Sequence, residues 1–147
     1  MPAYARDILL VEDDAADAIL IAEALAERGT RRTITQVGDG IAALDHLRST
    51  HGVRPDLIVT DLNMPRMNGH ELLGLLKTDK RLRTIPVVVL TSSSSDTDVL
   101  AAYGSHANAY VTKPIALDEF ITAVQSIDDF FLRTATIVGS EEVDDSE

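Results

Sequence analysis

Four short apolar runs, each followed at once by a reactive residue, constrain this chain more than any other feature. The runs are 8–11, followed by Glu12, Asp13 and Asp14; 57–60, followed by Asp61; 87–90, followed by Thr91; and 109–112, followed by Lys113. Runs this short and this rich in Val and Ile, separated by longer segments with helical patterns, predict parallel strands joined by helical crossovers. Because the carboxyl ends of parallel strands share one edge, where open α/β sheets bind ligands, these reactive side chains are expected to meet in one cleft.

The segments between the runs carry the apolar spacing of helices. We expect helices over about 15–28 with Gly29 as the stop, from 41 until Pro55, from about 69 to 84, after the serine run 92–95 until Gly104, and over 117–131. A more polar stretch, 33–37, is expected to be an edge strand. The βα order, repeated five times, predicts a single α/β domain.

Composition supports one compact domain and excludes several functions. The 147 residues are 45% hydrophobic, there is no cysteine for disulfides or thiolate metal sites, and the net charge of −11 argues against direct nucleic-acid binding. No apolar stretch suits a signal peptide or a membrane span, so we expect a cytoplasmic protein. We divide the chain into a lead, 1–6, a domain, 7–131, and an extension, 132–147, whose acidic end is expected to be disordered.

The acids at two strand ends predict a metal site. Glu12, Asp13 and Asp61 would crowd like charges together, which is unfavourable unless a cation lies between them. Oxygen ligands favour Mg²⁺ over zinc, because the chain has no cysteine and no suitably spaced histidines. The four histidines are instead expected to be solvated or to serve in packing.

The same edge could carry out chemistry on phosphorus. Beside Mg²⁺, Asp61 is a candidate nucleophile that would form an acyl phosphate, and the Lys113 ammonium would neutralise the phosphoryl oxygens. The Thr91 hydroxyl could donate to a phosphoryl oxygen, which would couple the chemistry to the position of a loop. Asn63 and Ser93, two positions beyond Asp61 and Thr91, are candidates for controlling water access.

Four ordered motifs resemble the receiver domain of two-component response regulators. They are Val11-Glu12-Asp13-Asp14, Asp61-Leu62-Asn63-Met64-Pro65 with Gly69, Leu90-Thr91-Ser92, and Tyr110-Val111-Thr112-Lys113-Pro114. The resemblance covers about 7–131 and implies a doubly wound (βα)5, flavodoxin-like or CheY-like fold with a parallel five-stranded sheet in the order 2-1-3-4-5. It also implies a signalling protein, not an enzyme acting on other substrates.

The resemblance further implies roles for individual residues. Asp61 would accept phosphate from a sensor histidine kinase, and the metal ligands would be Glu12, Asp13, Asp61 and the backbone carbonyl of Asn63. Thr91 would move toward the phosphoryl group, and Tyr110 would turn inward behind it. The Lys113–Pro114 peptide bond would be cis.

Among receivers, the sequences of the second and fourth motifs, which begin at Asp61 and Tyr110, are most similar to those of stand-alone regulators paired with phytochrome-type histidine kinases. That similarity implies a homodimer through the helix ending at 104, the strand 109–112 and the helix 117–131, with the extension adding to the contact. Apolar residues at 130–132 and 137–138 are expected to be exposed and to favour such a partner. Since the chain ends soon after the last helix, output is expected through protein contact or phosphate relay.

Two positions depart from the family pattern. His106 stands where receivers commonly have glycine, so either Gly104 adopts positive φ or His106 is strained. Ala116 lacks the oxygen that often caps the last helix.

Several other interpretations remain open. Asp13 or Asp14 could cap the first helix, Thr91 could be a capping residue as Ser94 and Ser95 are expected to be, and Tyr110 could simply pack. Two enzyme or cofactor-binding functions are alternatives to a signalling switch. An aspartyl-nucleophile phosphatase would need a second acid at the position of Asn63. A flavodoxin-like protein would bind a cofactor phosphate after its first strand, where the acids of this chain would repel it. A phosphorylation-independent scaffold and a phosphate sink also remain.

Overall fold

The computed structural model describes residues 6–27, 31–49 and 54–137. The strands are β1 (Arg6–Val11), β2 (Arg32–Val37), β3 (Leu57–Thr60), β4 (Val87–Thr91) and β5 (Ala109–Thr112). The helices are α1 (Ala15–Ala26), α2 (Gly40–Arg48), α3 (Gly69–Thr78), α4 (Asp96–Gly104), α5 (Leu117–Asp128) and a π-helix, η1 (Asp129–Thr134). Within these ranges no helix combines the length and the apolar character that crossing a bilayer requires.

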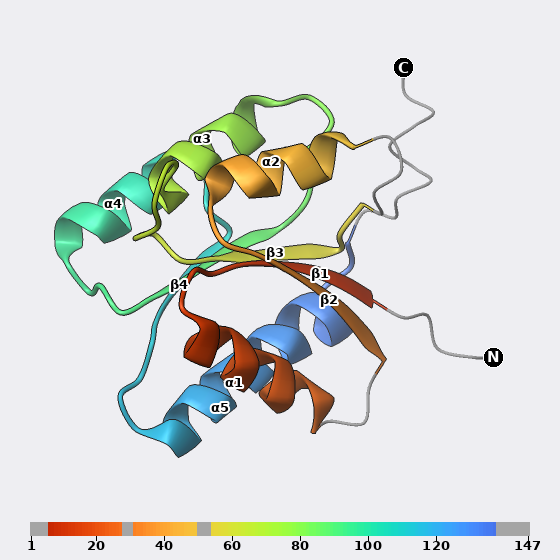
Figure 1. Ribbon diagram of the computed structural model, residues 1–147, viewed down its shortest axis with the longest axis vertical. Coiled ribbons are helices and arrows are strands. Elements are labelled where there is room, and N and C mark those ends of the chain that lie inside the picture. Colours follow the sequence, from red (N-terminus) through yellow and green to blue (C-terminus); the bar gives the residue numbers. More distant parts are fainter. Residues whose placement is uncertain (1–5, 28–30, 50–53, 138–147) are drawn as a thin grey trace.

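The five strands form one parallel sheet in the order β2-β1-β3-β4-β5, which confirms the predicted fold. Helices α1 and α5 cover one face, and α2, α3 and α4 cover the other (Figure 1). The register places Val11 beside Thr60, and Thr91 beside Thr112. The residues that follow these strands therefore lie along the same edge of the sheet.

The sheet separates two apolar cores, which explains the uninterrupted apolar runs in the sequence. Leu9 and Val11 pack in the core under α2 and α3, whereas Ile8 and Leu10 pack in the core under α1 and α5. Central strands buried on both faces lose the alternation of a half-exposed strand. The edge strand β2 is only partly buried, as its polar sequence predicted.

The end of the last helix differs from the prediction. The α-helix stops at Asp128 and a π-helix follows, so that Leu132 is buried and Phe131 and Ile137 pack against the core beneath α1 and α5. The prediction of exposed apolar residues is therefore wrong for Leu132, whereas Phe131 and Ile137 are partly buried against the same core. Phe130 is 54% exposed, as predicted. Val138 and the acidic tail lie outside the described residues.

The two positions that depart from the family pattern, His106 and Ala116, lie in the turns on either side of β5. His106 itself adopts positive φ, 72°, rather than Gly104. Ala116 precedes α5 without a side-chain capping bond. The described residues contain no cis peptide bond, so the expected cis Lys113–Pro114 bond is wrong; the preference between the isomers of an X–Pro bond is small enough for local packing to select either one.

Candidate functional site

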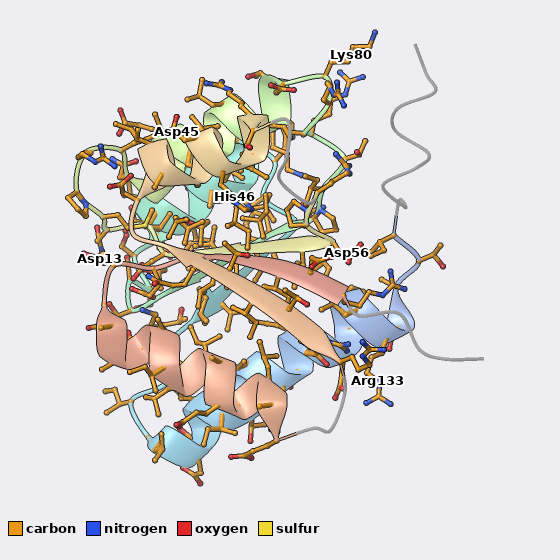
Figure 2. All side chains as sticks on the ribbon, turned by 45° about the vertical axis from the view of Figure 1, so that its right-hand side comes forward. Asp13, Asp45, His46, Asp56, Lys80 and Arg133 are labelled. Carbon is orange, nitrogen blue, oxygen red and sulfur yellow. The ribbon has the colours of Figure 1, made fainter. Side chains whose placement is uncertain are left out.

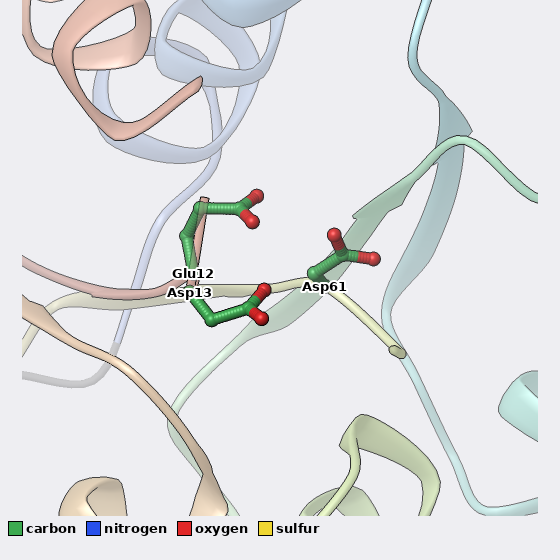
Figure 3. A group of neighbouring side chains, drawn as sticks. All are labelled: Glu12, Asp13 and Asp61. Carbon is green, nitrogen blue, oxygen red and sulfur yellow. The ribbon is translucent and has the colours of Figure 1, made fainter. Parts of the chain in front are cut away.

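Three carboxylates meet at the carboxyl edge of the sheet. Glu12 and Asp13 follow β1 and Asp61 follows β3, and one oxygen from each lies within 4.8 Å of the others (Figure 3). Glu12 and Asp61 are 1% and 9% exposed, whereas Asp13 is exposed to solvent. In Figure 2, Asp13 marks this edge and Asp56 marks the opposite one. The structure thus brings together the acids that the strand ends predicted.

The Lys113 ammonium, from the end of β5, lies among these acids. It donates hydrogen bonds to Glu12 Oε1 at 2.7 Å, to Asp61 Oδ2 at 3.0 Å and to Asp17 Oδ2 at 2.7 Å. Burial alone would lower the pKa of Lys113, but the bonds to Asp17 and Glu12 and the charge of Asp61 outweigh it and raise that pKa. Lys113 is therefore held as a cation against Asp61.

Asp17 is the site residue that the sequence analysis missed. It lies in the first turn of α1, four residues after Asp13, and its carboxylate accepts a hydrogen bond from Lys113. The usable signal was this spacing, because a residue one helical turn beyond a strand end can reach the same edge.

The acid cluster carries more negative charge than Lys113 neutralises. Burial raises the pKa of Glu12, and the hydrogen bond and charge of Lys113 only partly oppose that rise. A cluster of carboxylate oxygens with one exposed member suits a hard divalent cation that keeps part of its water shell. Glu12, Asp13 and Asp61 therefore fit the metal that the sequence predicted.

The backbone around Asp61 is tightly constrained. The Leu62 N–H donates to Asp61 Oδ1 at 2.6 Å, and the Gly69 N–H donates to the Leu62 carbonyl at 2.9 Å. A Cβ on Gly69 would lie 2.2 Å from the Asp61 carbonyl oxygen, so only glycine allows α3 to begin this close to the strand end. Asn63 is exposed in the loop that follows.

Thr91 and Tyr110 both contact the loop after β4. Thr91 is fully buried, and its Oγ1 accepts a bond from the Ser93 N–H at 3.4 Å. The Tyr110 hydroxyl donates to the Ser93 carbonyl at 2.8 Å. Burial raises the pKa of Tyr110, which keeps its hydroxyl protonated and able to donate. A change in this loop therefore reaches both side chains.

Two capping predictions are also resolved. Asp14 caps α1, with Oδ1 accepting from the backbone N–H groups of Ala16 and Asp17, which leaves the neighbouring Asp13 in the acid cluster. Ser95 caps α4, as predicted.

Comparisons with known proteins agree with this arrangement. The family model described as response regulator receiver domain matches residues 8–125. FilR2 of Methanothrix harundinacea, a probable methanogenesis regulatory protein, is 43% identical over 85% of this chain and 83% of its own. Response regulator Rcp1 of Synechocystis sp. is 40% identical over 88% of this chain and 91% of its own.

Two solved structures resemble the whole domain. The phosphorylated cyanobacterial phytochrome response regulator RcpA superimposes with a TM-score of 0.89, at 40% identity, over 92% of this chain and 100% of its own. The Mn²⁺-bound form of Rcp1 gives 0.87 at 39% identity, over 91% of this chain and 99% of that one. With its strand order, its acid cluster and a family match over most of its length, this chain belongs to the response regulator receiver domain family.

Proposed function

We propose that this protein is a phosphorylation-dependent switch in which Asp61 accepts a phosphoryl group from a sensor histidine kinase. The observation that carries the proposal is the Lys113 ammonium, 3.0 Å from Asp61 Oδ2, beside a cluster of carboxylates that fits a divalent cation. A carboxylate held against fixed positive charge is suited to attack phosphorus and to retain the product.

In the transfer step, an oxygen of Asp61 attacks phosphorus, a P–O bond forms, and the P–N bond to the donor histidine breaks. The imidazole leaves with the electron pair and takes up a proton. Lys113 donates to the phosphoryl oxygens, and Thr91 turns its hydroxyl toward them. Bound by Glu12, Asp13, Asp61 and the Asn63 carbonyl, Mg²⁺ would supply further neutralisation of the phosphoryl charge. The chain thus catalyses only its own phosphorylation and dephosphorylation.

The Mg²⁺ proposal follows from the all-oxygen donor set and the exposure of Asp13, which leaves room for water ligands. A relative, Rcp1, has a solved structure with Mn²⁺ bound. This supports a divalent cation in the present chain as well, since Mn²⁺ and Mg²⁺ both favour oxygen ligands.

We propose that phosphorylation changes protein contacts on the surface formed by α4, β5 and α5, and that a homodimer forms through the same surface. Leu100 and Tyr103 on α4 and Leu117 on α5 are 73%, 49% and 56% exposed. Exposed apolar side chains favour a protein partner. Phe130, which is exposed just before the extension, is proposed to add to the contact. Sedimentation of the phosphorylated and unphosphorylated protein tests this, and a monomer in both states at high concentration would contradict it.

The names of two relatives suggest which kinase acts here. Rcp1 and RcpA are, by name, response regulators, and RcpA is a phytochrome response regulator. We therefore propose a phytochrome-type kinase as the partner, acting in the cytoplasm, with no direct role for nucleic acid. FilR2, at 43% identity, is a relative whose name does not mention phytochrome, so purified histidine kinases of the phytochrome type and of other types belong in the transfer assay.

The test is intact mass after incubation with Mg²⁺ and phosphoramidate. Wild type should gain one phosphate, and Asp61→Asn should gain none. Asp14→Asn is the matched control, because it removes a neighbouring negative charge outside the acid cluster and keeps an oxygen that can cap α1. No adduct, together with no response to beryllofluoride, would contradict the proposal and favour a phosphorylation-independent scaffold. A short-lived adduct without any change in partner binding would indicate a phosphate sink.

A further inference from the structure

Three side chains outside the acid cluster join α3, α4 and the loop after β4. His70 Nε2, in the first turn of α3, lies 3.0 Å from Asp98 Oδ1 in the first turn of α4. The other oxygen, Asp98 Oδ2, accepts a hydrogen bond from Ser93 Oγ at 2.5 Å. We refer to His70, Asp98 and Ser93 as the α3–α4 clasp.

Ser93 is the residue through which the clasp reaches the site. Its N–H donates to Thr91 Oγ1, and its carbonyl accepts from the Tyr110 hydroxyl. The side chain of Ser93 is held by Asp98, while its backbone holds the two side chains that are proposed to move. Asp98 is thus connected to Thr91 and Tyr110 through one residue, Ser93.

Helix capping does not account for the clasp. Ser95 already accepts from the Asp98 N–H at 3.1 Å, so the Asp98 carboxylate is not the side chain that caps α4. Its two oxygens lie against Ser93 and His70, and hydrogen bonds from Ser93, His70 and, to a smaller extent, Ser95 lower the pKa of Asp98. The carboxylate therefore stays charged at neutral pH and able to accept both bonds.

The His70 ring is costly as a packing residue. Its Nδ1 is buried and has no hydrogen-bond partner among the described residues. An unsatisfied buried nitrogen is unfavourable, and an apolar ring of similar size would avoid this cost. The bond from Nε2 to Asp98 is the interaction that an apolar ring cannot supply. Residues that break a packing rule in this way are often kept for function.

We propose that His70 and Asp98 are positioning residues for the phosphoryl-acceptor site, acting through Ser93. They hold the Tyr110 hydroxyl on the Ser93 carbonyl, and we take this as the conformation in which the site binds a phosphoryl group. This inference rests on the proposed switch function. Because a ligand binds more tightly when its preferred conformation is already populated, loss of the clasp lowers the affinity for a phosphoryl mimic.

The first experiment reads Tyr110 directly in the unphosphorylated protein. The chain has three tyrosines, so 3-fluorotyrosine labelling gives three ¹⁹F signals, and the Tyr110→Phe variant identifies the relevant one. His70→Phe and Asp98→Ala should each shift or broaden the Tyr110 signal. Asp96→Ala is the matched control, because it removes an exposed charge from the same turn of α4. A Tyr110 signal that is unchanged in both clasp variants would overturn the proposal.

The second experiment measures beryllofluoride affinity with Mg²⁺ present. Loss of one hydrogen bond in the clasp should weaken binding about three- to tenfold, whereas Asp96→Ala should match wild type. His70→Gln keeps a donor and should restore most of the affinity. The His70→Phe/Asp98→Ala double variant should lose no more than either single variant, because all act through one chain of contacts. Additive losses, or a loss in Asp96→Ala of the same size, would contradict the inference.

The two experiments separate this inference from the function on which it rests. If wild type neither binds beryllofluoride nor gains a phosphate, the switch function fails. The ¹⁹F signal of Tyr110 in the unphosphorylated protein still decides whether the clasp positions that residue.

Discussion

At the scale of single residues, three carboxylates share hydrogen bonds from one ammonium group. Lys113 has three carboxylate partners, of which Glu12 and Asp61 belong to the acid cluster and Asp17 does not. Because the pKa of Lys113 is raised above its usual value of 10.5, the contribution of the Lys113 charge to stability is complete below that pH and is lost as pH rises beyond it. At neutral pH Lys113 is therefore charged, and its position among these partners depends on geometry.

Replacing Asp17 should release Lys113 toward Asp61. We expect Asp17→Asn to accept phosphate from phosphoramidate about two- to fivefold faster, because one negative charge that repels the anionic donor is removed and the ammonium keeps two partners. Rates of adduct formation by intact mass measure this. Glu23→Gln, at an exposed position later in α1, should leave the rate unchanged. A slower Asp17→Asn would mean that Asp17 holds Lys113 in its productive position.

His106 adopts a conformation that favours glycine. Its φ of 72° is costly for a residue with a side chain, so His106→Gly should raise the free energy of unfolding by about 1 kcal/mol. Urea denaturation measures the change. Ser105→Gly is the control, since Ser105 has a φ of −94° and glycine there should destabilise the protein. Equal effects at the two positions would show that φ at His106 is not the cause.

At the scale of the elements, the carboxyl edge is built from strand ends and helix starts together. Asp14, Asn68 and Ser95 cap α1, α3 and α4 at this edge, and each cap fixes the path of the loop that precedes its helix. Helix α5 begins at the same edge after Ala116, which provides no side-chain bond. The loop that carries Lys113 is therefore followed by the least restrained of these helix starts.

A capping oxygen at position 116 should stabilise α5. Ala116→Asp should raise the free energy of unfolding by about 1 kcal/mol, because a side-chain oxygen would satisfy a backbone N–H in the first turn. Chemical denaturation of the variant beside Ala116→Ser and Ser95→Ala measures it. Ser95→Ala should lose a similar amount, because it removes an existing cap. No gain in either Ala116 variant would show that the turn after Lys113 cannot adopt capping geometry.

At the scale of the whole molecule, the fold places a cluster of like charges at its proposed functional edge. The apolar cores on both faces of the sheet hold Glu12, Asp13 and Asp61 at close range despite their like charges. Stability and metal binding are therefore expected to oppose each other at this edge.

Melting temperatures with and without Mg²⁺ test this opposition. Without metal, Asp13→Asn should melt a few degrees higher than wild type, because it removes one charge from the cluster. Saturating Mg²⁺ should raise the melting temperature of wild type but not that of Asp13→Asn, since a ligand stabilises only a protein that binds it. The control Asp45→Asn, exposed on α2, should respond to Mg²⁺ as wild type does. Equal Mg²⁺ responses in Asp13→Asn and wild type would contradict a metal role for Asp13.

The sequence by itself determined the sheet and the cluster of acids. Strands buried on both faces need uninterrupted apolar runs, and a residue that follows such a run in a parallel sheet must lie at the carboxyl edge. Those two local rules were enough to bring Glu12, Asp61 and Lys113 together, and the structure agrees.

Only the tertiary structure decided which side chains support that edge. Asp17 reaches Lys113 across 96 residues of sequence and His70 reaches Asp98 across 28, and both contacts depend on how helices pack on the sheet. The π-helix after α5 likewise buries Leu132, which was expected to be exposed just after the last helix. Local patterns fix the direction of a side chain within its own element, but the rotation and spacing of neighbouring elements come from the packing of the whole core.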